Sequence, residues 1–104
     1  MRARMLLFVA VAAIGIGSAH GADPNLGRDV AANCANCHGT NGRSRGGVPS
    51  LAGRDAASIV KQVREFRDGT KSSTIMQQLA KGYTDAQIEA AAAYFAAQPA
   101  ADAK

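Results

Sequence analysis

The stretch Cys34-Ala35-Asn36-Cys37-His38 decides the fold of this 104-residue chain. On a helix its two thiols stand one turn apart, so both can add across the vinyl groups of one haem. The histidine that follows is then carried beneath the porphyrin, where its imidazole can bind the iron. This Cys-x-x-Cys-His spacing is the attachment signature of a c-type haem. We therefore predict that Cys34 and Cys37 bind haem covalently and that His38 is an axial ligand of the iron.

Residues 1–21 have the composition of a secretory signal peptide. Arg2 and Arg4 precede an apolar run over residues 5–16, and small residues lead to an expected cleavage after Gly21, with Ala19 as the alternative position. This run is too short for a transmembrane helix, and no later stretch is apolar for long enough. We expect an exported, periplasmic protein without a membrane span.

Loss of this leader changes what the composition implies. The net charge falls from +4 to about +2 because two arginines are removed, and no cluster of basic and aromatic residues indicates nucleic-acid binding. The remaining 83 residues carry only 15 large apolar side chains. A chain this small usually needs a disulfide, a metal or a cofactor to complete its core. We predict one haem-centred domain over residues 22–98 and a flexible C-terminal tail over residues 99–104.

Helical patterns account for this domain, and no segment alternates as a β-strand does. Asn25 is the expected N-cap of the first helix, Asp55 of the second, and Thr84 with Gln87 form a capping box before the last. Pro99 prevents that last helix from extending. The expected helices span residues 26–33, 56–68, 76–81 and 85–98, and a glycine-rich loop covers residues 39–53. The fold class is therefore all-α.

Without the leader the chain retains one histidine and one methionine. His38 is then the only available imidazole, and the sixth iron position is open to Met76, a lysine or water. Met76 is favoured because a thioether is neutral and soft, and His/Met ligation suits an electron carrier of raised potential. A ligating imidazole also needs its other N–H held, often by a backbone carbonyl. We expect Pro49 to supply that carbonyl to His38; alternatively, Pro49 only shapes a turn.

Three alternatives to haem attachment are weaker. A disulfide between Cys34 and Cys37 would close a very small loop and leave the adjacent histidine unexplained. A structural zinc site needs four ligands, and cysteine and histidine together offer three. A thioredoxin-like redox pair needs a βαβ unit, which the pattern does not predict.

In order, these motifs resemble those of the class I cytochromes c from residue 27 to residue 98. The shared features are Cys-x-x-Cys-His-Gly, a Pro-x-Leu-x-Gly segment over residues 49–53, a methionine, and a helix with Ala-Ala-Tyr-Phe over residues 92–95. The resemblance implies helices wrapped around one covalent haem. It also implies that the first and last helices cross, with Gly27, Val30 and Ala31 meeting Tyr94 and Phe95.

Residues 73–76 and 80–83 are similar to the methionine loop of the cytochrome subunit of flavocytochrome c sulfide dehydrogenase. This implies a haem subunit, not an enzyme by itself, that accepts electrons from a flavoprotein oxidising sulfide. Some of these subunits have two haem domains, whereas a single Cys-x-x-Cys-His predicts one haem here. Two alternatives are a free diffusible carrier feeding an oxidase or reductase, and a ligand-binding or sensory haem protein in which Met76 leaves the iron.

Overall fold

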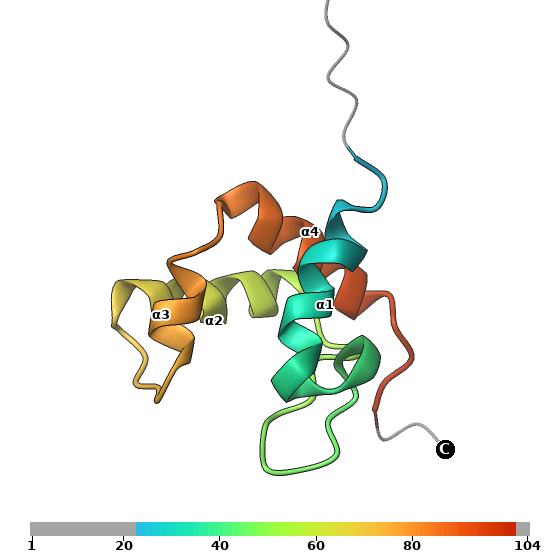
Figure 1. Cartoon of the computed structure of the whole chain (residues 1–104), viewed down its shortest axis with the longest axis horizontal. Helices are drawn as coiled ribbons and strands as arrows, with labels where there is room; N and C mark the ends of the chain where they lie inside the picture. Colours follow the sequence, from blue (N-terminus) through green and yellow to red (C-terminus); the bar gives the residue numbers. More distant parts are fainter. Residues whose placement is uncertain (1–22, 102–104) are drawn as a thin grey trace, which may run out of the picture.

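The structure, a computed structural model, describes residues 23–101, so the expected leader lies outside the described residues. The elements in chain order are α1 (Leu26–His38), the 3-10 turn η1 (Thr40–Gly42), α2 (Ala56–Asp68), α3 (Met76–Ala80) and α4 (Asp85–Ala96). Helix α1 packs against α4, and α2 packs against both α4 and α3 (Figure 1). Residues 23–101 contain no strand, which confirms the all-α prediction. None of the described helices has the length and apolar character needed to cross a membrane.

The predicted capping residues define the ends of α2 and α4. Asp55 Oδ2 accepts the Ser58 N–H at 2.9 Å, and Gly69 closes α2 in the left-handed conformation with φ 78°. The Thr84 N–H donates to Gln87 Oε1 at 2.9 Å, and the Gln87 N–H donates to Thr84 Oγ1 at 3.2 Å. The predicted capping box is therefore present.

Helix α1 begins where predicted, with Asn25 at the N-cap, but it lacks the expected side-chain cap and ends later than predicted. The Asn25 side chain makes no capping hydrogen bond; instead the Asp23 carboxylate accepts the Asn25 N–H at 2.9 Å. The pattern predicts an end near residue 33, whereas the helix continues through His38 to Gly39, whose φ of 86° is not helical. This extension puts both cysteines and the histidine on one helix. Helices α3 and α4 end one or two residues before their predicted ends.

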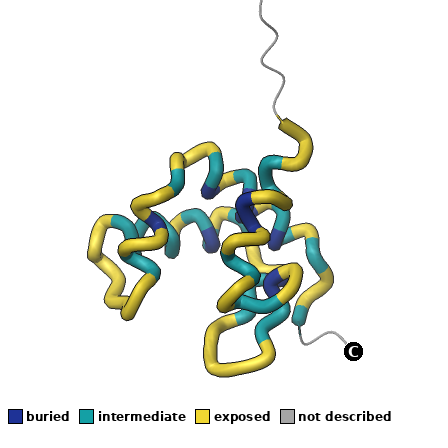
Figure 2. Tube along the Cα trace, viewed as in Figure 1, coloured by how far each residue is buried: buried dark blue, intermediate teal, exposed yellow. Residues whose placement is uncertain are grey.

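The core forms where α1, α2 and α4 meet (Figure 2). Helices α1 and α4 touch backbone to backbone, because a Cβ on Gly27 would lie 2.5 Å from Ala90 O and 3.3 Å from Tyr94 Cβ. The predicted crossing of the first and last helices is therefore present. The buried cluster consists of Val30, Ala31, Ile59, Ala91, Ala92 and Phe95.

The last described residues pack on the loop between η1 and α2. Arg43 in this loop donates to Pro99 O and to Ala101 O, each at 3.3 Å. A Cβ on Gly53 would lie 2.7 Å from Ala100 Cα. The first residues of the predicted tail, 99–101, therefore contact this loop.

The close crossing predicts the effect of one added methyl group. Gly27→Ala is expected to destabilise the protein by about 1–3 kcal/mol, because the Cβ forces α1 and α4 apart. Guanidinium unfolding followed by circular dichroism measures this loss. Gly46→Ala is the matched control, since a Cβ there meets no atom within 4 Å, and its effect should stay within about 0.5 kcal/mol. Equal losses in the two variants would contradict the tight crossing.

Candidate functional site

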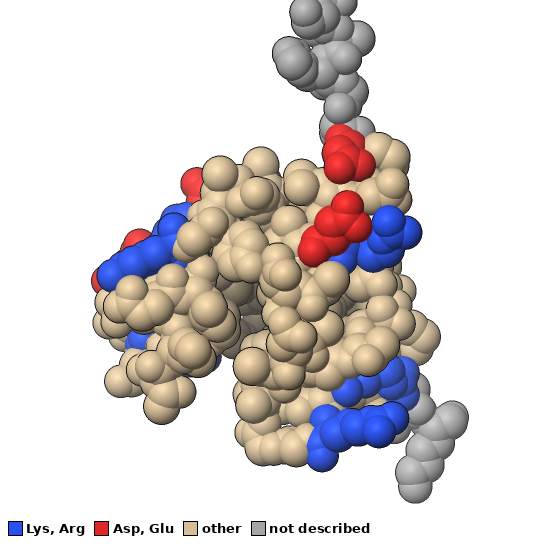
Figure 3. All heavy atoms as spheres, in the orientation of Figure 1, with Lys and Arg blue, Asp and Glu red and all other residues tan. Residues whose placement is uncertain are grey.

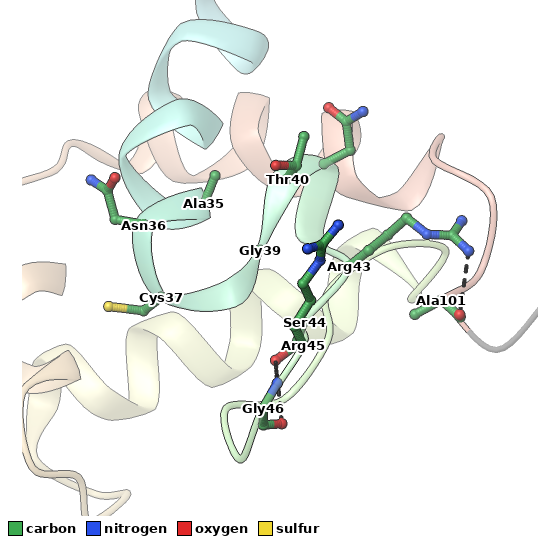
Figure 4. A pocket seen from close by; sticks show the side chains of 11 residues that line it. Ala35, Asn36, Cys37, Gly39, Thr40, Arg43, Ser44, Arg45, Gly46 and Ala101 are labelled. Carbon is green, nitrogen blue, oxygen red and sulfur yellow. Dashed lines mark hydrogen bonds between the residues drawn. The ribbon is translucent and has the colours of Figure 1, made fainter.

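Cys34, Cys37 and His38 occupy the C-terminal end of α1. Both cysteines are free thiols, and their spacing of three residues places them on neighbouring positions of the helix surface. Cys34 is half-buried, and this burial raises the pKa of its thiol, whereas Cys37 is exposed. The Cys37 side chain points away from the loop that carries Arg43 and Ser44 (Figure 4). One helix end therefore presents two thiols and an imidazole.

A single hydrogen bond fixes the His38 ring. Its Nδ1 lies 2.6 Å from Pro49 O. A carbonyl oxygen only accepts, so Nδ1 carries the proton, and the Nε2 lone pair of the neutral ring stays available. Within residues 23–101 no hydrogen bond engages Nε2. Metal-binding histidines commonly have this arrangement, with one nitrogen held by a carbonyl and the other free to bind.

The Pro49 carbonyl reaches His38 because its loop is anchored on η1 and α4. Gly42 O accepts the Leu51 N–H at 2.8 Å, two residues beyond Pro49. Gly42 has φ 79°, and a Cβ on it would lie 2.7 Å from Phe95 Cδ1. Only glycine fits such a close approach to a buried ring with this backbone conformation.

Met76 begins α3 and is half-buried. The surface is hollowed between α3 and the end of α1, and the charged side chains on this face lie away from the hollow (Figure 3). The structure therefore places the methionine on an element separate from the thiols and the histidine, on the helix that borders the hollow opposite α1.

Exposed apolar side chains close in sequence to Pro49 and Met76 suit a haem. Among the described residues, the exposed large apolar side chains are Val48, Ile75 and Leu79, with exposed fractions of 39%, 54% and 44%. Val48 precedes Pro49, while Ile75 and Leu79 flank Met76 in the sequence. Such side chains gain free energy when an apolar group covers them. Thiols, an imidazole, a thioether and apolar neighbours are together the donors and lining that a haem c needs.

The other uses of the cysteines gain no support from the described part of the chain. There the two thiols are free, and no three His, Cys, Asp or Glu side chains come close enough to hold a metal ion. A thioredoxin-like site would need strands, and residues 23–101 form only helices, turns and loops.

Sequence reasoning missed one polar contact beside the site. The Tyr94 hydroxyl donates to Asn41 Oδ1 at 2.6 Å, across 53 positions of sequence. Asn41 has φ 54°, and among the described residues it is the only non-glycine residue with positive φ. The Asn41-Gly42 pair signals the left-handed turn, because asparagine before glycine is typical of such turns, but it does not signal the contact with Tyr94.

Known proteins share both the sequence and the fold. The cytochrome subunit of sulfide dehydrogenase from Chlorobaculum tepidum is 39% identical over 69 residues, which are 66% of this chain and 63% of that protein. Cytochrome c-554(548) from Halomonas halodenitrificans is 31% identical over 80 residues, which are 73% of this chain and 96% of that protein. The solved cytochrome c4 from Acidithiobacillus ferrooxidans has a TM-score of 0.62 and 31% identity, covering 74% of this chain and 52% of that one.

This chain therefore spans less than two thirds of the sulfide dehydrogenase subunit and about half of cytochrome c4. These relatives are cytochromes, electron carriers or subunits rather than catalytic enzymes in their own right, which agrees with the prediction for this chain. Residues 22–95 match the protein family described as cytochrome C oxidase, cbb3-type, subunit III. The chain belongs to this family of cytochromes c, and it has the class I cytochrome fold.

Proposed function

We propose that this chain is a periplasmic monohaem cytochrome c that accepts electrons as the haem subunit of a flavoprotein sulfide dehydrogenase. The observation that carries the haem assignment is the 2.6 Å contact between His38 Nδ1 and Pro49 O, on the same helix end as two free thiols. The identity of 39% to a cytochrome subunit of sulfide dehydrogenase supports the partner. The signal-peptide composition of residues 1–21 supports the periplasm.

Each site residue has a distinct task in this proposal. Cys34 and Cys37 would hold a haem covalently through their sulfur atoms, and the His38 Nε2 and the Met76 thioether would be the donors to its iron. The Pro49 carbonyl accepts the hydrogen bond from His38 Nδ1. This bond orients the ring and makes its Nε2 more basic. The haem iron, when bound, supplies a one-electron centre that alternates between the ferric and ferrous states. A neutral methionine ligand favours the ferrous state and so raises the potential.

The surface near the site supports electron exchange through loose contact. On the face shown in Figure 3 the charged side chains lie away from the hollow. The exposed side chains of Val48, Ile75 and Leu79 would exclude water from a haem edge and offer an apolar surface to a partner.

A second candidate function is that of a free carrier that feeds an oxidase or reductase. The observation that favours it is the match to cytochrome c-554(548), because the aligned region covers 96% of that protein. A chain of this length can thus correspond to nearly all of another cytochrome. The two candidates share the haem chemistry and differ in the electron donor.

Loss of the thiols tests covalent attachment. The variant with Cys34→Ala and Cys37→Ala is expected to carry no covalent haem and to lose most of its helicity, because within residues 23–101 five of the nine buried apolar side chains are alanine. Pyridine haemochrome spectra and far-ultraviolet circular dichroism measure the two effects. Asn36→Ala, an exposed change within the same motif, should keep both properties. Native helicity in the haem-free variant would refute the dependence on haem.

Loss of the thioether tests the sixth ligand. Met76→Ala is expected to abolish the far-red ferric absorption band of sulfur-ligated haem and to lower the potential by part of the range of about 0.8 V that axial ligands span. Spectroscopic redox titration measures both. Gln78→Ala, exposed on the same helix, is the control. If the wild type at neutral pH already lacks the band, Met76 is not the ligand, and the ligand-binding or sensory alternative is favoured.

The electron donor is tested by reconstitution. Sulfide with the flavoprotein subunit of a sulfide dehydrogenase is expected to reduce the haem protein within the turnover time of the flavoprotein, while sulfide alone does so far more slowly. Stopped-flow absorbance measures the rates, and gel filtration detects the complex. A cytochrome c of another family is the control for unspecific reduction. Equal rates for the two cytochromes, with no complex, would instead support the free carrier.

A further inference from the structure

The turn that follows His38 contains a residue in the left-handed conformation. Asn41 has φ 54° and ψ 24° within η1, a region that asparagine adopts more readily than most residues with side chains. A hydrogen bond of 2.6 Å from the Tyr94 hydroxyl to Asn41 Oδ1 ties this turn to α4.

This turn is connected to the histidine by a short series of contacts. The next residue, Gly42, accepts the N–H groups of Leu51 and Ala52 at 2.8 Å and 3.1 Å. Those two residues follow closely on Pro49, whose carbonyl lies 2.6 Å from His38 Nδ1. The turn η1 begins two residues after His38 in the chain, and the loop that η1 anchors contacts the His38 imidazole through Pro49 O. The position of η1 therefore acts on the imidazole by both routes.

The loop is also held at its far end by α4. The Gly53 N–H donates to Phe95 O at 2.9 Å, one residue beyond Tyr94. The Tyr94 and Phe95 rings meet edge to face, with centroids 5.9 Å apart and planes at 74°. Adjacent residues of one helix thus fix the turn and the end of the loop.

We propose that Tyr94 is a positioning residue for the iron ligand: its hydroxyl holds η1, and η1 in turn sets the Pro49 carbonyl against His38. This rests on the proposed function, since it takes His38 as an axial ligand. A shorter bond to the carbonyl makes the imidazole more basic and favours ferric iron. When the turn relaxes, the bond weakens and the reduction potential rises.

Two variants isolate the contact in the haem-loaded protein. Tyr94→Phe removes only the hydroxyl and retains the ring packing. Asn41→Gly removes the accepting side chain and tolerates the left-handed backbone. Ser58→Ala is the matched control, because it also removes a single hydroxyl, and the Ser58 Oγ accepts its hydrogen bond from Gln62 Nε2 on the same helix, α2, at 3.4 Å.

The potential and the His38 Nδ1 proton resonance are the readouts. Tyr94→Phe and Asn41→Gly should each raise the ferrous-to-ferric ratio at a fixed applied potential, by up to about tenfold. For one electron this corresponds to a rise in the reduction potential of up to about 59 mV. The double variant should shift it no further, and Ser58→Ala should match the wild type. The Nδ1 proton resonance should move upfield in both single variants.

Two results would count against the inference in different ways. With haem attached, an unchanged potential and resonance in Tyr94→Phe overturn it, even if the unfolding midpoint falls, because the tyrosine is then only structural. Absence of covalent haem from the wild type overturns the proposed function and this inference together.

Discussion

The close approach of α1 to α4 at Gly27 is the constraint on which the rest of the structure depends. Since no side chain separates the helices there, the position of α1 is set by the backbone of α4 at Ala90. The end of α1 carries the thiols and His38, while α4 carries the aromatic residues that contact η1 and the following loop. The helix crossing therefore determines where both the imidazole and its carbonyl partner lie.

This crossing is so important because the core is small. In the described part of the chain the buried apolar residues are mostly alanines, and Phe95 is the only large side chain there that is almost fully enclosed. Alanine buries little area, so each helix contact must be close to contribute much free energy. In the proposed function the haem supplies the missing apolar mass, and its loss removes part of the core as well as the redox centre.

The sequence could predict those features that depend on neighbouring residues. The caps at Asp55 and Thr84 are local hydrogen bonds, and the attachment motif is a local spacing. The predicted end of α1 was wrong because the last turn of this helix contains no apolar periodicity. Contacts with η1 and the following loop support that turn instead. Asn25 occupies the predicted N-cap position of α1, but its side chain makes no capping hydrogen bond, and the Asp23 carboxylate accepts the Asn25 N–H. The Tyr94–Asn41 contact joins distant segments, so no local pattern could reveal it.

The Arg43 hydrogen bonds to the last described residues have a mechanical consequence. Arg43 lies in the same loop as Pro49, and its guanidinium donates hydrogen bonds to the carbonyl groups of Pro99 and Ala101. Force applied to the chain beyond Ala101 therefore reaches the loop that orients His38 before it reaches any helix. A tag or a fused domain attached there would pull on the loop that orients His38. A flexible spacer is therefore needed if the reduction potential of the site is to be preserved.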